Sequence, residues 1–114
     1  MAAVRVCEYI DSNGSSPWAK WRRSLDAEAL ARVTTALYRM AEGNFSNVKG
    51  VGAGVFERVL DWGPGYRIYF AKDGDTIVIL LGGSSKKGQQ RAIDEAKQHW
   101  DDYRRRKATG KAWH

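Results

Sequence analysis

Three short β-patterned segments in the second half of the chain constrain its fold more than any other feature. They span residues 56–61, 66–72 and 76–81, are rich in β-branched and aromatic residues, and are separated by glycine-containing turns. The turns read Gly63-Pro64-Gly65 and Asp73-Gly74-Asp75. Turns this short join antiparallel neighbours, so the stretch predicts a meander. Residues 77–81 are apolar throughout, which predicts a central strand covered on both faces.

The residues before the meander predict one strand and two helices. Residues 4–10 alternate in a way that suits a strand with one side buried. Ser16 followed by Pro17 indicates the start of a short helix that runs to about Ser24. Asp26 is a cap for a second helix, which ends at residues 42–44. Its apolar positions recur at steps of three and four, namely Leu30, Val33, Leu37 and Met40 or Ala41.

Two further segments complete the chain. Residues 45–54 are rich in glycine and asparagine and predict an irregular loop that leads into the sheet. A long third helix is expected from near Ser85 to about Arg106, with Ile93, Ala96 and Trp100 in its apolar stripe. The order of elements predicts an α+β fold, with a mainly antiparallel four-stranded sheet, two N-terminal helices and a long C-terminal helix. We expect the helices to lie mainly on one face of the sheet.

Length and composition restrict the class of protein. At 114 residues the chain has room for one core, so we expect a single domain over residues 1–107 and a flexible tail over 108–114. A formal charge of +6 favours a polyanionic partner. The single cysteine, Cys7, can form no internal disulfide, and no hydrophobic signal region or membrane-spanning run is present. A cytoplasmic location is therefore expected.

The chain resembles a known family in the meander and the residues that follow it. Residues 61–70 read Asp-Trp-Gly-Pro-Gly-Tyr-Arg-Ile-Tyr-Phe, and residues 80–87 read Leu-Leu-Gly-Gly-Ser-Ser-Lys-Lys, with Gln89 and Gln90 ahead of Ile93. In these motifs it resembles the RelE/ParE superfamily of toxins from bacterial type II toxin–antitoxin modules. More narrowly, it resembles addiction module killer proteins of the HigB-like branch. The superfamily contains both ribosome-dependent mRNA endonucleases and gyrase inhibitors on one fold, so the resemblance leaves the cellular target open.

Arg67 is the first candidate site residue, because it matches the arginine of the family's Gly-Tyr-Arg motif. The resemblance implies that this arginine holds the scissile phosphate, and a guanidinium group can bind two phosphate oxygens at once. The alternative is a structural arginine neutralised by Glu57 or Asp61.

Lys86 and Lys87 are expected in the first turn of the last helix, where free amides and two ammonium groups make an anion site. The alternative for this pair is two solvated lysines at a polar turn.

Arg58 is a further catalytic candidate, and its position depends on the hairpin between residues 56–61 and 66–72. Burial favours a loop with an odd number of residues, because that loop places Phe56 and Leu60 beside Ile68 and Phe70. An odd loop sends Arg58 to the face opposite Arg67. The family pattern Glu-x-Arg-x-Asp would place its arginine at Val59, whereas here the arginine stands one residue earlier.

Four other residues are candidate RNA or phosphate contacts: Lys49, Lys72, Tyr69 and Trp62. The other tryptophans at helical core spacing are expected to pack in the interior. His99 and His114 have no partner at ligand spacing, so we expect no metal and no cofactor.

If the chain is an mRNA interferase, its lysines and arginines must do the chemistry. The resulting hypothesis makes Arg67 a phosphate clamp and Lys86 or Lys87 a general base or second clamp. The alternatives are a ParE-like inhibitor of gyrase that cuts nothing, and a basic module that only binds RNA or protein. The resemblance also implies a cognate antitoxin, usually a small helix-turn-helix DNA-binding protein, with mRNA on the ribosome as target. Operator DNA would be bound only through the antitoxin, and no membrane partner is expected.

Overall fold

The computed structural model describes residues 4–110, which form an α+β fold with a long C-terminal helix. The strands are β1 (Arg5–Glu8), β2 (Val48–Gly52), β3 (Val55–Val59), β4 (Arg67–Asp73) and β5 (Ile77–Ser84). The helices are α1 (Pro17–Arg23), α2 (Ala27–Ala41) and α3 (Gln89–Ala108), with a 3-10 turn at Lys86–Gly88 directly before α3. The predicted fold class is confirmed.

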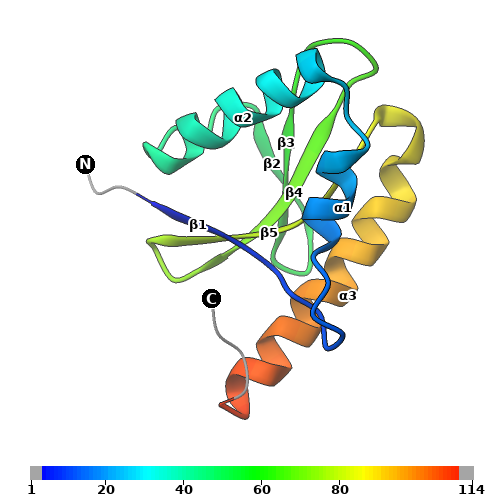
Figure 1. Cartoon of the computed structure of the whole chain (residues 1–114). Coiled ribbons are helices and arrows are strands. Elements are labelled where there is room, and N and C mark those ends of the chain that lie inside the picture. The colour runs from blue at the N-terminus through cyan, green and yellow to red at the C-terminus, as the bar shows by residue number, and fades with distance from the viewer. Residues whose placement is uncertain (1–3, 111–114) are drawn as a thin grey trace.

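β5 is a central strand and not an edge strand, because it lies between β1 and β4 in the sheet order β1-β5-β4-β3-β2 (Figure 1). β1 pairs with β5 in parallel, and every other pair is antiparallel. Val78 and Leu80 are buried towards one face of β5, and Ile79 and Leu81 towards the other. The prediction of a central strand covered on both faces is therefore confirmed.

The sheet has five strands among the described residues, where the sequence predicted four. The additional strand is β2, which lies in the segment expected to be an irregular loop. β2 pairs with β3, and a tight turn with positive φ at Gly52, Ala53 and Gly54 joins the two. Glycines lower the intrinsic strand preference of this segment, but hydrogen bonding to β3 compensates for it at the edge of the sheet.

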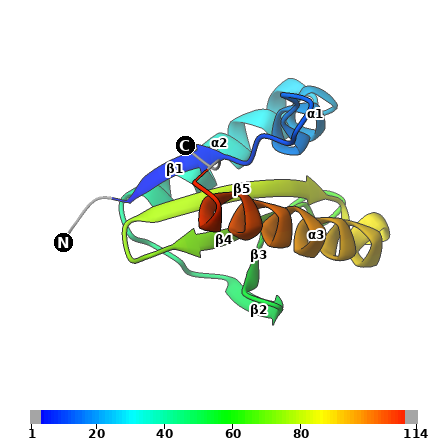
Figure 2. The ribbon, with the colours of Figure 1, turned by 90° about the horizontal axis from the view of Figure 1, so that it is seen from below.

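The helices cover both faces of the sheet, so the expectation that they lie mainly on one face is wrong. One hydrophobic cluster joins α1 and α2 to the sheet through residues such as Trp18, Val33 and Phe70. The other joins α3 to the opposite face through residues such as Tyr69, Ile79 and Trp100. Figure 2 shows the sheet between the α1–α2 pair and α3. Since β4 and β5 are apolar on both sides, each side needs its own cover.

The predicted starts of the first two helices are confirmed in atomic detail. Ser16 Oγ accepts a hydrogen bond of 3.0 Å from the Ala19 amide, and Pro17 is the first residue of α1. Asp26 Oδ1 accepts from the Ala29 amide at 2.8 Å and caps α2. At the other end of the chain, α3 continues two residues past the expected Arg106, and residues 111–114 of the expected tail lie outside the described residues.

α1 lies against β5 at a glycine. A Cβ atom on Gly83 would come within 2.3 Å of the Trp21 ring, so only glycine allows this approach. Trp18, one turn earlier, is 2% exposed. These contacts confirm that Trp18 packs in the interior, as Trp100 does on the opposite face.

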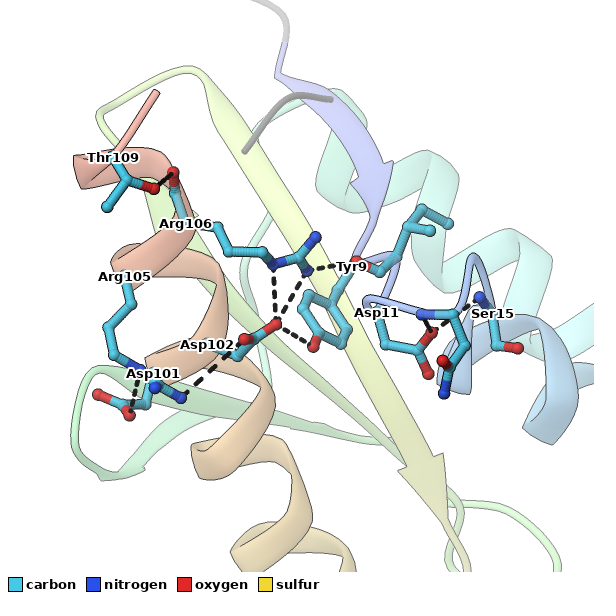
Figure 3. Close-up of polar contacts among 10 residues, drawn as sticks. Tyr9, Asp11, Ser15, Asp101, Asp102, Arg105, Arg106 and Thr109 are labelled. Atoms are coloured by element: carbon cyan, nitrogen blue, oxygen red, sulfur yellow. Dashed lines mark hydrogen bonds and ion pairs between the residues drawn. The ribbon is translucent and has the colours of Figure 1, made fainter. Parts of the chain in front are cut away.

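The C-terminal half of α3 is fixed to the segment after β1 by polar contacts (Figure 3). The Tyr9 hydroxyl donates to Asp102 Oδ2 at 2.6 Å, and Arg106 Nε donates to the same oxygen at 2.9 Å. Arg106 also donates to the Ile10 carbonyl. The far end of α3 is thereby held in place relative to the sheet.

Within the described range, none of the helices combines the length and the apolar character that a transmembrane span requires.

Candidate functional site

The turn between β3 and β4 brings Arg67 close to the start of the last helix. Arg67 Nη1 donates to the Gly65 carbonyl at 2.6 Å, and the Lys86 amide donates to the Pro64 carbonyl at 3.1 Å. Gly65 has a φ of +69°, and a Cβ atom there would lie 3.2 Å from Arg67 Nη1 and 3.4 Å from Lys86 Cβ. Arg67 and Lys86, two of the predicted site residues, therefore flank the same glycine.

A buried carboxylate lies beside Arg67. Glu57 is fully buried, with Oε2 3.5 Å from Arg67 Nε and Oε1 3.5 Å from Lys49 Nζ. Gln89 Nε2, in the first turn of α3, donates to Oε2 at 2.9 Å. Glu57 thus links residues from β2, β4 and α3, and it neutralises part of the charge that Arg67 and Lys49 bring.

The Glu57–Arg67 pair is held at ion-pair distance without a hydrogen bond. In the described part of the chain, Glu57 Oε1 and Arg67 Nε are the buried side-chain atoms that lack a hydrogen-bond partner. The Arg67 side chain is 10% exposed, so the guanidinium group is largely shielded from water.

Tyr69 lies beneath this site and not on its surface. It is fully buried, and its hydroxyl is 3.0 Å from Ser84 Oγ. Burial raises the pKa of Tyr69, so the phenol stays protonated at neutral pH. Because its side chain is fully buried, Tyr69 has no exposed ring surface on which an RNA base could stack.

Arg58 and Arg67 lie on opposite faces of the sheet. Arg58 pairs with Ile68 and Val59 pairs with Arg67, which confirms the prediction of an odd loop. Arg58 Nη1 donates to the Asn44 carbonyl at 2.9 Å on the side covered by α2. Val59 therefore occupies the place beside Arg67, and Arg58 adds no charge to that site.

The remaining predicted residues are dispersed. Lys72 places Nζ 4.3 Å from the centre of the Phe45 ring, among the residues of the α2 face. Trp62 is half-buried under the Arg32 guanidinium, whose carbon lies 4.4 Å from the ring centroid. Lys87 is exposed next to Lys86 in the 3-10 turn.

Three residues in charged surroundings were not predicted as site residues from the sequence. Gln89 was noted only as part of a motif, although it holds Glu57. Arg32 and Arg39 lie seven residues apart in α2, and this spacing places them on one side of the helix. The odd loop places Arg58 on the sheet face opposite Arg67. Together with the helical spacing, it was the sequence signal that could have grouped Arg32, Arg39 and Arg58.

The arrangement around Gly65 is suited to holding a phosphate group. Arg67 supplies a planar donor on a strand, and Lys86, whose Cβ lies across Gly65 from it, supplies a flexible four-carbon side chain that can bring an ammonium group to the same turn. Among residues 4–110, no group of three or more potential ligand side chains is positioned to hold a metal ion.

Comparison with solved structures gives the fold. A double arginine-to-alanine variant of the E. coli toxin RelE, in the free state, matches with a TM-score of 0.63 and 16% sequence identity. The match covers 84% of this chain and 96% of that chain. At this identity the likeness establishes a RelE-like fold.

Comparison of sequences gives the family. No family model matches the chain. An uncharacterized protein of Haemophilus influenzae is 39% identical over 69 residues, which are 60% of this chain and 70% of the relative. The chain therefore belongs to the same protein family as this Haemophilus influenzae protein, on a fold like that of RelE.

Proposed function

We propose that the protein is the toxin of a type II toxin–antitoxin module, of the HigB-like branch, and acts as a metal-independent mRNA endonuclease on the ribosome. The RelE-like fold supports the class of protein. The observation that carries the site is the meeting of Arg67 and Lys86 on either side of Gly65. This juxtaposition brings a fork-shaped donor and an ammonium group to one turn, as phosphate chemistry without a metal requires.

The proposed reaction is an internal transesterification of RNA. A ribose 2′-hydroxyl loses its proton to Lys86 or Lys87, whichever is present as a neutral amine, and the 2′-oxygen forms a bond to the adjacent phosphorus. The bond from phosphorus to the 5′-oxygen breaks, and that oxygen takes up the proton from the newly formed ammonium group. The products are a 2′,3′-cyclic phosphate and a free 5′-hydroxyl. Arg67 stabilises the extra negative charge on the phosphorane, the role to which an always-charged guanidinium is suited.

A ParE-like inhibitor of gyrase is the second candidate, and a specific observation favours it. Val59 occupies the place beside Arg67, and Glu57 offsets charge from both Arg67 and Lys49. The site consequently carries fewer uncompensated cations than a phosphate-cleaving centre without metal would use. In this case the contact surface for gyrase would include α1 and α2. A basic module that binds RNA or protein without acting on it is the remaining class.

One pair of assays separates these classes. Primer extension on cellular message after induction of the protein detects cleavage, and a supercoiling assay with purified gyrase detects inhibition. The endonuclease proposal predicts new 5′ ends and unchanged supercoiling. Loss of supercoiling without new 5′ ends would indicate the gyrase inhibitor. If neither effect is observed, the remaining class is a module that only binds RNA or protein.

The proposal implies partners and a cellular location. We infer a cognate antitoxin, a small helix-turn-helix DNA-binding protein, that neutralises the toxin and connects it to operator DNA. The net charge of +6 supports capture by an acidic surface on that partner. We place the protein in the cytoplasm, where both ribosomes and the antitoxin would be available.

A further inference from the structure

A second positively charged cleft lies on the face of the sheet opposite Arg67. It has a volume of about 430 Å³ and lies between α2 and the end of β3. Its cations are Arg32 and Arg39 from α2 and Arg58 from β3, and Asn47 and Trp62 also line it. Of these residues, Arg58 and Trp62 were predicted from the sequence as part of the RNA-cleaving site, and the structure places both in this cleft.

Arg58 is the unusual member of this cleft. It is 4% exposed, and its Nη1 donates to the Asn44 carbonyl, but no described residue forms an ion pair with it. Burial, and next the charge of Arg39, lower the pKa of Arg58. A buried guanidinium group without a counter-ion costs stability, since it has left water without gaining an opposite charge.

The charges of the cleft leave two guanidinium groups uncompensated. Arg32 is engaged by Glu28 at 3.8 Å and by the Trp62 ring. Neither Arg39 nor Arg58 forms an ion pair with any residue from 4 to 110. Glu28 and Asp61 also line the cleft, so its net charge is +1, and the two guanidinium groups without an ion pair remain as donors for a bound anion.

We infer that this cleft binds a phosphate monoester or inorganic phosphate, held between Arg39 and Arg58. Such a group carries nearly two negative charges at neutral pH and accepts bidentate hydrogen bonds from guanidinium groups. The cleft is also large enough for a ligand of nucleotide size. The structure favours this class over an RNA strand because Arg32 covers the Trp62 face on which a base would stack.

The experiment measures binding by isothermal titration calorimetry on the intact protein. The probes are inorganic phosphate, uridine 5′-monophosphate, acetate and a short RNA without a terminal phosphate, all at matched ionic strength. The variants are Arg39→Ala and Arg58→Met, and Arg23→Ala, an exposed arginine of α1 outside the cleft, is the matched control. Arg39 is exposed on a helix, so the Arg39→Ala variant should fold. It therefore tests the cleft even if the Arg58→Met variant does not fold.

We expect phosphate or the nucleotide to bind, and both cleft variants to bind at least about tenfold more weakly, because each loses charge-assisted hydrogen bonds. The control should bind as the wild type does. Tighter binding of the nucleotide than of inorganic phosphate would identify a nucleotide as the source, and equal binding would identify free phosphate. The inference is overturned if neither binds, if Arg39→Ala retains full affinity, or if acetate or the RNA binds more tightly through these arginines. Because the readout is binding alone, the result is independent of the proposed cleavage of RNA.

Discussion

Glu57 Oε2 and Arg67 Nε lie 3.5 Å apart on one face of the sheet, and Glu57 is fully buried. The pair fixes the guanidinium group on β4, since Glu57 is itself held by Gln89 from α3. Arg67 is thus positioned by residues that are distant in sequence. Its proposed chemical role depends on a carboxylate that reduces the local positive charge.

Replacing Glu57 with glutamine should therefore weaken the fold. Glu57→Gln keeps the shape of the side chain but leaves Arg67 buried without a counter-ion, and we expect a loss of about 2 kcal/mol in the free energy of unfolding. Urea denaturation measures this loss. The exposed Glu95→Gln serves as the control, because its pair with Arg91 is on the surface. An unchanged stability for Glu57→Gln would show that Arg67 does not depend on Glu57.

A methyl group on Gly83 should displace α1 from the sheet. The added Cβ would lie 2.3 Å from the Trp21 ring, so we expect Gly83→Ala to destabilise the protein by about 1–3 kcal/mol through overpacking. Near-ultraviolet circular dichroism should report the changed tryptophan environment. Gly50→Ala is the matched control in a strand, since nothing lies within 4 Å of its added Cβ. Equal stability of the two variants would refute the close contact between Trp21 and β5.

The core of the fold could be predicted from sequence because it depends on local patterns. The apolar run in β5, the turns at Gly63 and Gly74 and the caps at Ser16 and Asp26 each report directly on the backbone. β2 was not predicted, because its glycines are unfavourable in a strand. Its strand structure comes from pairing with β3. Strand stability of this kind is set by a partner and not by the segment itself.

The candidate site was predictable only in part. Strand parity correctly placed Arg58 opposite Arg67, because side chains alternate regularly along a strand. The link from Gln89 to Glu57 could not be derived, since it depends on how α3 lies over β3. The cleft around Arg39 likewise required the angle at which α2 crosses the sheet, which residue spacing does not supply.

The contact between Tyr9 and Asp102 should make stability depend on alkaline pH. Burial, and next the hydrogen bond to Asp102, raise the pKa of Tyr9 to about 12. Its contribution is fully present below the unfolded value near 10 and is lost as the pH rises towards 12. We expect Tyr9→Phe to lower stability by about 1 kcal/mol at neutral pH and to flatten this alkaline decline. Parallel declines in Tyr9→Phe and wild type, measured by urea denaturation from pH 9 to 12, would contradict this account.

The initial rate of message cleavage in a ribosome-coupled primer-extension assay, compared between the wild type and Arg67→Lys, tests the central claim most directly. Lysine can still neutralise Glu57, but it cannot form the two-pronged contact to phosphate, so the variant should fold and cut at least about tenfold more slowly. Arg23→Ala, with an unchanged rate, is the control. The account predicts cleavage by the wild type and a strong loss in Arg67→Lys. Cleavage by Arg67→Lys at the wild-type rate, or no cleavage by the wild type on ribosomes, would contradict it.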